Sequence, residues 1–284
     1  MTSGVQAAAL RFYKLSGSGN DFVFFDAREG NPALAGDPAA VAALCARGEG
    51  GGADGVVFLD APEAGVVRIV YLNSDGSRAA LCGNATLCAV RLAAHLQLVT
   101  PGEPFVIRTD AGQFGAHLDH AGAPAFELAP VRALTADALN APMAGAGAGT
   151  ELRIGYAIAG VPHLVVRVTD VDAVDVLTRG RLLRPPTPER PEGANVNFVS
   201  PAPDGAWRMR TFERGVEGET LACGTGAVAC AAVLRAWGEA DDVVRLLTRS
   251  GRTVTVVSPT DAERGPTLSG EGRLVFEGVL RDWR

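Results

Sequence analysis

Short apolar segments separated by turn residues run through most of this chain, and the pattern predicts a protein built mainly of β-strands. In the first half, the expected strands are residues 10–14, 22–26, 55–59, 66–72, 105–109 and 115–118. The Ser, Gly, Asn and Asp residues of 16–21 and 73–77 predict loops. Apolar residues at helical spacing predict a buried helix over 84–96, and Asp37 followed by Pro38 predicts a shorter helix over 38–46.

The second half of the chain repeats this order of elements. Its expected strands are residues 151–158, 164–168, 196–199, 207–212, 253–257 and 273–279, and its expected helices are 171–183 and 225–237. The tripeptides Cys82-Gly83-Asn84 and Cys223-Gly224-Thr225 each precede a buried helix, and they lie roughly half the chain length apart. We therefore expect an α+β fold with two pseudo-symmetric domains, each of which wraps a mixed β-sheet around a central helix.

The junction between the two domains is expected near residues 122–130, where the strand pattern fades. The first domain then comprises residues 1–125 and contains Cys82, and the second comprises residues 126–272 and contains Cys223. The final segment, 273–284, has no evident partner in the second half, so we expect it to return to the first domain as a strand.

Composition and charge narrow the class of protein. The 284 residues are 47% hydrophobic and 20% charged, with a net charge of −6, which excludes a disordered chain and disfavours nucleic acid or an anionic membrane as a partner. Five cysteines in a chain of this length do not form a disulfide framework, and we find no signal peptide or membrane span, so a cytoplasmic protein is expected. Lys14 is the only lysine, which leaves one candidate for a pyridoxal-phosphate Schiff base.

The two Cys-Gly tripeptides are the candidate catalytic sites. A cysteine at the start of a helix lies at the positive end of the helix dipole, which favours the thiolate. The N–H groups of the same helix start can bind a carboxylate. Since Cys82 and Cys223 occupy equivalent places in the two halves, we expect facing thiols across a cleft between the domains.

A pair of facing cysteines can invert a carbon centre without a cofactor. One thiolate takes a proton from one face of the carbon, while the other thiol delivers a proton to the opposite face. A metal site is the weaker interpretation, because the spacing of Cys82 and Cys88 is not that of a zinc ribbon and no histidine is close in sequence. We therefore expect neither a metal nor another cofactor. Cys45, Cys88 and Cys230 lie at apolar helix positions and are expected to be structural.

Eight short motifs, in order along the chain, resemble those of the diaminopimelate epimerase family, which are pyridoxal-independent two-cysteine amino-acid epimerases. They are GSGNDF at 17–22, GADG at 52–55, NSDGS at 73–77, LCGN at 81–84, GVPH at 160–163, NVNF at 195–198, ERG at 213–215 and TLACGTG at 220–226. The resemblance extends from Lys14 to the C-terminus. It implies epimerisation of LL-diaminopimelate to meso-diaminopimelate, a step in lysine and peptidoglycan precursor synthesis, with no cofactor.

By the same resemblance, Cys82 and Cys223 are the two acid/base thiols. The residues that hold the carboxylate at the reacting carbon are Gly83, Asn84, Gly224 and Thr225. The residues that bind the far end of the substrate are Asn20, Asn73, Asn195 and Arg214, and Glu213 meets an amino group. This set suits a substrate that is zwitterionic at both ends, since an arginine grips a carboxylate with two parallel hydrogen bonds. Asp54 and Asp75 are expected to brace loops, and His163 either supports the site or is structural.

The chain departs from the family pattern at three places. Leu87 stands where the family often has arginine, Val161 stands where many members have asparagine, and the segment around Glu217 is one residue longer than the shortest version. These differences leave open a second hypothesis, a racemase of another amino acid, such as histidine, on the same fold. A thiol-redox protein is a third hypothesis, although the chain has no Cys-x-x-Cys motif. Since two-fold assemblies are common among soluble enzymes, a homodimer is the expected assembly.

Overall fold

The computed structural model describes residues 10–30, 33–119, 121–138, 151–188, 190–261 and 263–281. The chain forms two compact units: unit 1 is Met1–Pro124 with Glu271–Arg284, and unit 2 is Ala125–Gly270. Unit 1 is therefore assembled from two separate stretches of chain, whereas unit 2 is one continuous segment.

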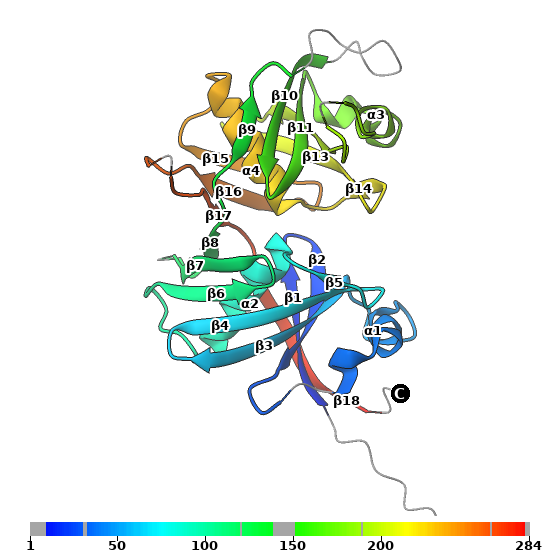
Figure 1. Ribbon diagram of the computed structural model, residues 1–284, viewed down its shortest axis with the longest axis vertical. Helices are drawn as coiled ribbons and strands as arrows, with labels where there is room; N and C mark the ends of the chain where they lie inside the picture. Colours follow the sequence, from blue (N-terminus) through cyan, green and yellow to red (C-terminus); the bar gives the residue numbers. More distant parts are fainter. Residues whose placement is uncertain are drawn as a thin grey trace, which may run out of the picture. The chain divides into compact units, whose positions relative to one another are not determined.

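The strands of unit 1 form a mixed sheet in the order β18-β1-β2-β3-β4-β6-β7, with β5 paired to β4 (Figure 1). The pairs β2–β3 and β4–β6 are parallel, and the other pairs are antiparallel. The strands are β1 (Leu10–Gly17), β2 (Asn20–Asp26), β3 (Gly55–Glu63), β4 (Val66–Asn73), β5 (Arg78–Ala79), β6 (Phe105–Thr109), β7 (Gly112–Leu118) and β18 (Arg273–Leu280). The helices are η1 (Ala33–Gly36), α1 (Pro38–Cys45) and α2 (Gly83–His95).

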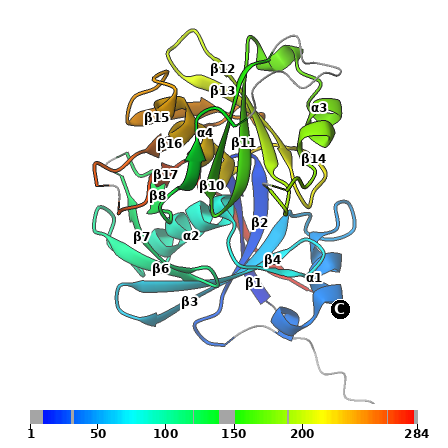
Figure 2. The same cartoon turned by 45° about the horizontal axis from the view of Figure 1, so that its top comes forward.

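The strands of unit 2 form a mixed sheet in the order β9-β10-β11-β12-β13-β15-β16-β17-β8, with β14 paired to β13 (Figure 2). The strands are β8 (Pro124–Glu127), β9 (Arg132–Thr135), β10 (Glu151–Ala159), β11 (Val161–Val168), β12 (Asn195–Pro201), β13 (Trp207–Glu213), β14 (Gly218–Thr220), β15 (Val243–Leu247), β16 (Thr253–Val257) and β17 (Thr267–Ser269). The helices are η3 (Val171–Ala173), α3 (Val176–Leu183) and α4 (Gly224–Ala236).

The two units share one pattern of strand pairing. In unit 1, an antiparallel hairpin β1–β2 is followed by a parallel partner β3, its antiparallel neighbour β4, and a parallel partner β6. Unit 2 repeats these directions: the antiparallel hairpin β10–β11 is followed by a parallel partner β12, its antiparallel neighbour β13, and a parallel partner β15. The central helix stands at the same place in both orders, because α2 precedes β6 and α4 precedes β15. The expected α+β fold with two similar halves is confirmed.

The central helices are buried nearly all round. Nine of the 13 residues of α2 and nine of the 13 residues of α4 are buried, as is typical of helices that lie in the core and not on a surface. Helix α2 packs against β1, β4, β7 and β18, and α4 packs against β9, β10, β11, β12 and β16. Leu87, one of the departures from the family pattern, is fully buried and fills the core of unit 1.

Several local predictions need correction. The expected loop 16–21 is a two-residue hairpin turn at Ser18 and Gly19, whose φ angles of 51° and 99° fit a type I′ turn. The helix predicted over 171–183 is divided in two: η3 ends at Ala173, and α3 begins at Val176 because Asp175 caps it by accepting a hydrogen bond from the N–H of Thr178. Strand β9 was not predicted, because all four of its residues are exposed and carry no hydrophobic alternation.

In the described part of the chain, no helix has both the length and the apolar character needed to span a membrane. Residues 1–9, on which the absence of a signal peptide was inferred, lie outside the described residues.

Candidate active site

The central helix of unit 1 begins at the first candidate cysteine. Cys82 is the N-cap of α2, with an extended backbone (φ −132°, ψ 114°), and no side-chain hydrogen bond caps the helix. Its carbonyl accepts from both the N–H and the hydroxyl of Thr86, each at 2.9 Å. The apolar pattern predicts a helix over 84–96, and the observed helix begins one residue earlier, at Gly83. Cys82 is half-buried.

The central helix of unit 2 begins in the same way. Cys223 is the N-cap of α4, with nearly the same backbone angles (φ −133°, ψ 108°) and again no side-chain cap. Its carbonyl accepts from the N–H of Ala227 at 2.9 Å, and its sulfur lies 3.6 Å from the hydroxyl oxygen of Thr225. The two cysteines therefore occupy the same position of the same element in each unit.

The capping of these two helices differs from that of α1 and α3. Asp37 and Asp175 cap α1 and α3, and their carboxylates accept from backbone N–H groups at 3.0 and 3.1 Å. Because the first N–H groups of a helix have no partner within the helix, the starts of α2 and α4 present donors that no side-chain cap occupies. Such a helix start suits a carboxylate ligand, and here a thiol lies directly beside it.

The three remaining cysteines are structural, as expected. All five cysteines are present as thiols. Burial raises the pKa of Cys45 to about 11 and raises the pKa of Cys88 and Cys230 well above the usual value for a thiol. These three thiols stay protonated at neutral pH and are poor proton acceptors.

Asn20 and Asn84 are in direct contact in unit 1. Nδ2 of Asn84 donates to Oδ1 of Asn20 over 2.8 Å, and Nδ2 of Asn20 donates to Asp54 over 2.9 Å. Asp54 also accepts from the N–H of Asp21 at 3.1 Å and from Arg47 at 2.8 Å. Both amides are therefore oriented, and the buried Oδ1 of Asn84 has no hydrogen-bond partner. An unpaired buried oxygen beside the helix start suits an ammonium or N–H group of a ligand.

Asn73 lies in the same unit but in a separate cluster. Its Nδ2 donates to the hydroxyl of Ser77 over 2.9 Å, and Asp75 accepts from the N–H of Ser77 at 2.8 Å. These contacts with Ser77 hold the pKa of the Asp75 carboxyl below its usual value. Asp75 therefore braces this loop, as Asp54 braces the loop before β3. Among the hydrogen bonds of the described residues, none joins Asn73 to Asn20.

In unit 2, Asn195 and Arg214 are joined. Oδ1 of Asn195 accepts from the backbone N–H of Arg214 over 2.7 Å, and the guanidinium contacts the carbonyl and carboxylate of Glu192 at 3.0 and 3.1 Å. The Glu192 side chain is 69% exposed, so a ligand carboxylate can replace it on the guanidinium. Glu213 ends β13 beside Arg214, and its burial raises the pKa of its carboxyl, an effect that the neighbouring Thr220 opposes.

His163 belongs to a buried polar cluster next to Cys223. Burial, with a smaller effect of the Arg214 charge, lowers the pKa of His163 to about 3, so the imidazole is neutral at physiological pH. Its Nδ1 accepts from Nδ2 of Asn197 at 3.2 Å, while Oδ1 of Asn197 accepts from the hydroxyl of Thr211 at 2.9 Å. A Cβ on Gly226 would lie 2.4 Å from Oδ1 of Asn197 and 3.2 Å from the Cys223 sulfur, so Gly226 lets this cluster approach the thiol.

Lys14, the single candidate for a Schiff base, forms an ion pair. It is buried in β1, and its ammonium pairs with the Asp21 carboxylate at 2.7 Å and contacts the carbonyl of Gly52. An amine that is protonated and paired in this way is a poor nucleophile. Among the described residues, no group of His, Cys, Asp and Glu side chains is arranged to hold a metal ion.

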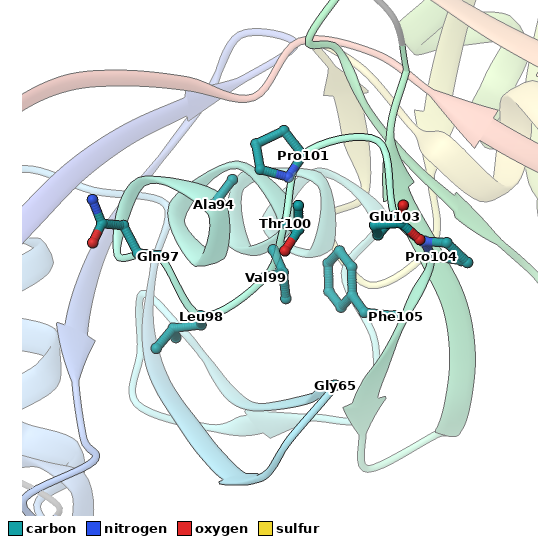
Figure 3. Close-up of a pocket in the computed structure, with 10 residues that line it drawn as sticks. All are labelled: Gly65, Ala94, Gln97, Leu98, Val99, Thr100, Pro101, Glu103, Pro104 and Phe105. Carbon is teal, nitrogen blue, oxygen red and sulfur yellow. The ribbon is translucent and has the colours of Figure 1, made fainter.

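A surface pocket of about 590 Å³ lies at the other end of α2, far along the helix from Cys82 (Figure 3). It is lined by Gly65, Ala94, Gln97, Leu98, Val99, Thr100, Pro101, Glu103, Pro104 and Phe105. Glu103 is the one ionisable side chain in this lining, so the pocket lacks a pair of groups for acid/base chemistry.

The structure adds residues that the sequence analysis gave no role. Asn197 could have been found, because it lies two residues after Asn195 and side chains two apart share one face of a strand. Gly226 ends the TLACGTG motif, but its contact with Asn197 has no sequence signal, since it joins distant segments.

Solved structures with this fold include a phenazine biosynthesis protein and a hydroxyproline epimerase. A phenazine biosynthesis protein of the PhzF family from Bacillus anthracis matches with a TM-score of 0.71 and 15% identity, over 96% of this chain and 99% of that one. A hydroxyproline epimerase from Agrobacterium vitis matches with a TM-score of 0.67 and 19% identity, over 97% and 93%. These likenesses show the fold, in which this chain places a cysteine at the start of each central helix.

The family is shown by sequence. The diaminopimelate epimerase family model matches residues 12–133 and 155–275. A diaminopimelate epimerase from Gemmatimonas aurantiaca is 48% identical over 95% of this chain and 99% of its own length, and one from Aquifex aeolicus is 37% identical over 96% and 98%. The chain belongs to the diaminopimelate epimerase family.

Proposed function

We propose that this protein epimerises LL-diaminopimelate to meso-diaminopimelate without a cofactor, in the lysine and peptidoglycan precursor pathway of the cytoplasm. The observation that carries the proposal is the matched pair of helix starts, each with a cysteine as N-cap and no side-chain cap on its N–H groups. The substrate is inferred from the relatives, which are named diaminopimelate epimerases and align over nearly the whole chain.

Cys82 and Cys223 are the acid and base of the reaction. One thiolate takes the α-hydrogen, so an S–H bond forms as the C–H bond breaks and the electron pair remains on the α-carbon. The negative charge spreads onto the α-carboxylate, which the N–H groups at the helix starts stabilise. The other thiol then gives its proton to the opposite face of the carbon. The two sulfurs have exchanged protonation states, and the centre is inverted.

The remaining site residues bind the two ends of the substrate. Gly83, Asn84, Gly224 and Thr225, at the helix starts, hold the carboxylate of the reacting centre. The buried Oδ1 of Asn84 accepts from the ammonium at that centre. Asn20, Asn73, Asn195 and Arg214 bind the distal end, where Arg214 exchanges Glu192 for the substrate carboxylate. Glu213 pairs with the distal ammonium, which offsets the cost of ionising a buried carboxyl.

The protein is a homodimer in this proposal, and an apolar edge of unit 1 supports it. In the described residues β18 pairs with β1 alone, and three apolar side chains on it, Val275, Phe276 and Val279, are 43%, 51% and 51% exposed. An exposed apolar edge strand is a surface that a second subunit covers. Sedimentation of the wild type should give the mass of a dimer, and Phe276→Glu should shift it to that of a monomer.

The central experiment is α-hydrogen exchange. The reduced protein is incubated with LL-diaminopimelate in D₂O without added cofactor, beside Cys82→Ala and Cys223→Ala. We expect deuterium incorporation with inversion in the wild type and loss of inversion in both variants. Cys45→Ala, which removes a buried thiol outside both helix starts, is the matched control and should remain active.

The alternatives give different results in the same assay. A racemase of another amino acid would leave diaminopimelate unlabelled and exchange the α-hydrogen of that amino acid, with histidine as the first to test. A thiol-redox protein would exchange neither substrate, and its measured property would be a reversible change between dithiol and disulfide.

A further inference from the structure

Three polar side chains of unit 1 form a hydrogen-bonded row that ends at the start of α2. Nδ2 of Asn20 donates to the Asp54 carboxylate over 2.9 Å, and Oδ1 of Asn20 accepts from Nδ2 of Asn84 over 2.8 Å. Asn84 is the second residue of α2 and is 4% exposed, and its own Oδ1 is buried without a hydrogen-bond partner. This oxygen is the free end of the row.

The Asp54 carboxylate fixes the direction of every bond in the row. Asp54 forms an ion pair with Arg47 at 2.8 Å, and an ionised carboxylate accepts hydrogen bonds but donates none. Asn20 must therefore turn its nitrogen toward Asp54 and its oxygen toward Asn84. Because that oxygen only accepts, Asn84 must give its nitrogen to Asn20, which leaves its own oxygen for a ligand. Without such partners an asparagine amide can turn over, since its oxygen and nitrogen are of nearly the same size.

Further contacts hold Asp54 in place. Its backbone N–H donates to the carbonyl of Asp21 over 2.8 Å, and its carboxylate accepts from the N–H of Asp21 at 3.1 Å. The carboxylate oxygen that accepts from Asp21 also accepts from Asn20, whereas Arg47 contacts the other oxygen. The two oxygens of Asp54 therefore have separate partners, and this side chain presents only an acceptor to Asn20.

We propose that Asp54 is a positioning residue that sets the specificity of this helix start: through Asn20 it turns the Asn84 amide so that the amide oxygen faces the substrate and accepts from the ammonium of the reacting centre. The inference rests on the proposed function, in which Asn84 lies at that centre. A reversed amide would turn its N–H groups toward the ammonium, and two donors repel each other. Asp54 thereby favours an α-amino acid over the same acid without its ammonium.

Asp54→Asn should reverse the row. The new amide has one oxygen and one nitrogen, and the Arg47 guanidinium takes the oxygen because it can only donate. The nitrogen then faces Asn20, whose amide turns over, and Asn84 turns its nitrogen toward the substrate. Arg47→Ala in the same protein frees the oxygen to accept from Asp21 and Asn20 again. The double variant Arg47→Ala/Asp54→Asn should therefore restore the original direction.

Neutron diffraction determines the direction of these bonds without any substrate, because it locates deuterium and distinguishes nitrogen from oxygen. In wild-type crystals the deuteron between Asn20 and Asn84 should lie on Asn84, and in Asp54→Asn it should lie on Asn20. Arg47→Ala/Asp54→Asn should match the wild type. A deuteron that stays on Asn84 in Asp54→Asn overturns the role of Asp54, whatever the protein does with diaminopimelate.

Steady-state kinetics tests the specificity. Asp54→Asn should raise KM for LL-diaminopimelate by about 10- to 100-fold, the effect of losing a hydrogen bond to a charged group, while kcat changes little. The inhibition constant of pimelate, which has both carboxylates and neither ammonium, should remain unchanged, whereas general damage to the site would weaken both ligands. Arg47→Ala/Asp54→Asn should recover most of the loss in KM.

Asp60→Asn is the matched control, because Asp60 also pairs with an arginine of unit 1, Arg68, at 2.6 Å and is not part of the row. It should leave KM unchanged. A wild-type KM in Asp54→Asn overturns the assigned specificity. Conversely, a reversed amide in a protein that fails to exchange the α-hydrogen of diaminopimelate would sustain the positioning role and remove the proposed substrate.

Discussion

The amide of Asn84 donates to the amide oxygen of Asn20 over 2.8 Å, and this bond links the start of the central helix α2 to the first hairpin of the chain. The bond fixes both amides, because Asn20 must then donate to Asp54, and it leaves Oδ1 of Asn84 buried without a partner. The orientation of the proposed binding residues Asn20 and Asn84 thus depends on a chain of bonds that begins at the Asp54 carboxylate in the loop before β3.

Asn20→Asp tests that chain of bonds. The substitution places a second carboxylate where an amide now donates to Asp54 over 2.9 Å. Two carboxylates at this distance repel each other, and we expect a loss of about 2 kcal/mol in the free energy of unfolding at pH 7. The loss should shrink near pH 4.5, where one carboxyl becomes protonated. Urea unfolding at the two pH values measures both effects.

Asn73→Asp is the control for this prediction. The amide of Asn73 donates to the neutral hydroxyl of Ser77, so the new carboxylate meets a group that can donate to it. Its effect on unfolding at this half-buried position should stay within about 0.5 kcal/mol, because the contact with Ser77 is kept. An equal loss in Asn20→Asp at both pH values would contradict the repulsion between the two carboxylates.

Arg214→Ala should lower kcat/KM for diaminopimelate by about 10²- to 10³-fold, because it removes the proposed charged partner of the distal carboxylate. Arg214→Lys should recover only part of this loss, since an ammonium cannot form two parallel hydrogen bonds. Steady-state kinetics in both directions provides the measurement. Arg208→Ala, which removes a surface arginine paired with Asp172 in the same unit, should change kcat/KM by less than about twofold. If Arg214→Ala behaves like Arg208→Ala, the distal-carboxylate assignment is wrong.

Gly226→Ala should lower kcat while the unit remains folded. The added Cβ comes within 2.4 Å of the Asn197 oxygen and 3.2 Å of the Cys223 sulfur, so one of the two groups must move. Misplacement of an acid/base group by a fraction of an ångström to one ångström costs up to about 10²-fold in rate. Gly218→Ala is the matched control, because the nearest atom to its Cβ would be 3.9 Å away. Circular dichroism and kcat of both variants separate misplacement from unfolding, and equal kcat values would refute the steric argument.

The free energy of unfolding should depend on pH through the protonation of His163. Burial lowers its pKa from 6.5 to about 3, so the folded state keeps it neutral while the unfolded state binds a proton as the pH falls below 6.5. The folded state therefore loses stability between pH 6.5 and pH 3, by about 2 kcal/mol from this group on going from pH 7 to pH 5. His163→Gln should reduce this loss, as measured by urea unfolding at pH 7 and 5. An unchanged pH dependence would show that His163 does not titrate in this way.

The repeat of the two halves could be predicted because the same local sequence patterns occur in each half. Asp37 before Pro38 gave a correct helix start, and the tripeptides at Cys82 and Cys223 marked the two central helices. The exact helix starts could not be predicted, because asparagine and threonine are better caps than cysteine and the chain leaves the helices without a side-chain cap.

Only part of the polar network around the site could be predicted from the sequence. The motifs contain Asn20 and Asn84, but nothing in the local pattern shows that the two amides meet across 64 positions of the chain. The neighbours of Tyr71 in β4 are likewise hidden, since they come from β2 and β3 and depend on strand register. Contacts of this kind are set by the tertiary fold, and single-sequence patterns report only local periodicity.

The return of β18 to β1 has a consequence for the order in which the protein is made. Leu10 pairs with Leu280 and Ser16 with Arg273, so β1 is synthesised long before its partner β18. Unit 2, which spans Ala125–Gly270, is complete before β18 has been synthesised, whereas unit 1 lacks the partner of β1 until β18 has been made. During that interval β1 has an open edge that can pair with other strands. The N-terminal half is therefore the part of the nascent chain that needs protection from non-native strand pairing, even though it is made before unit 2.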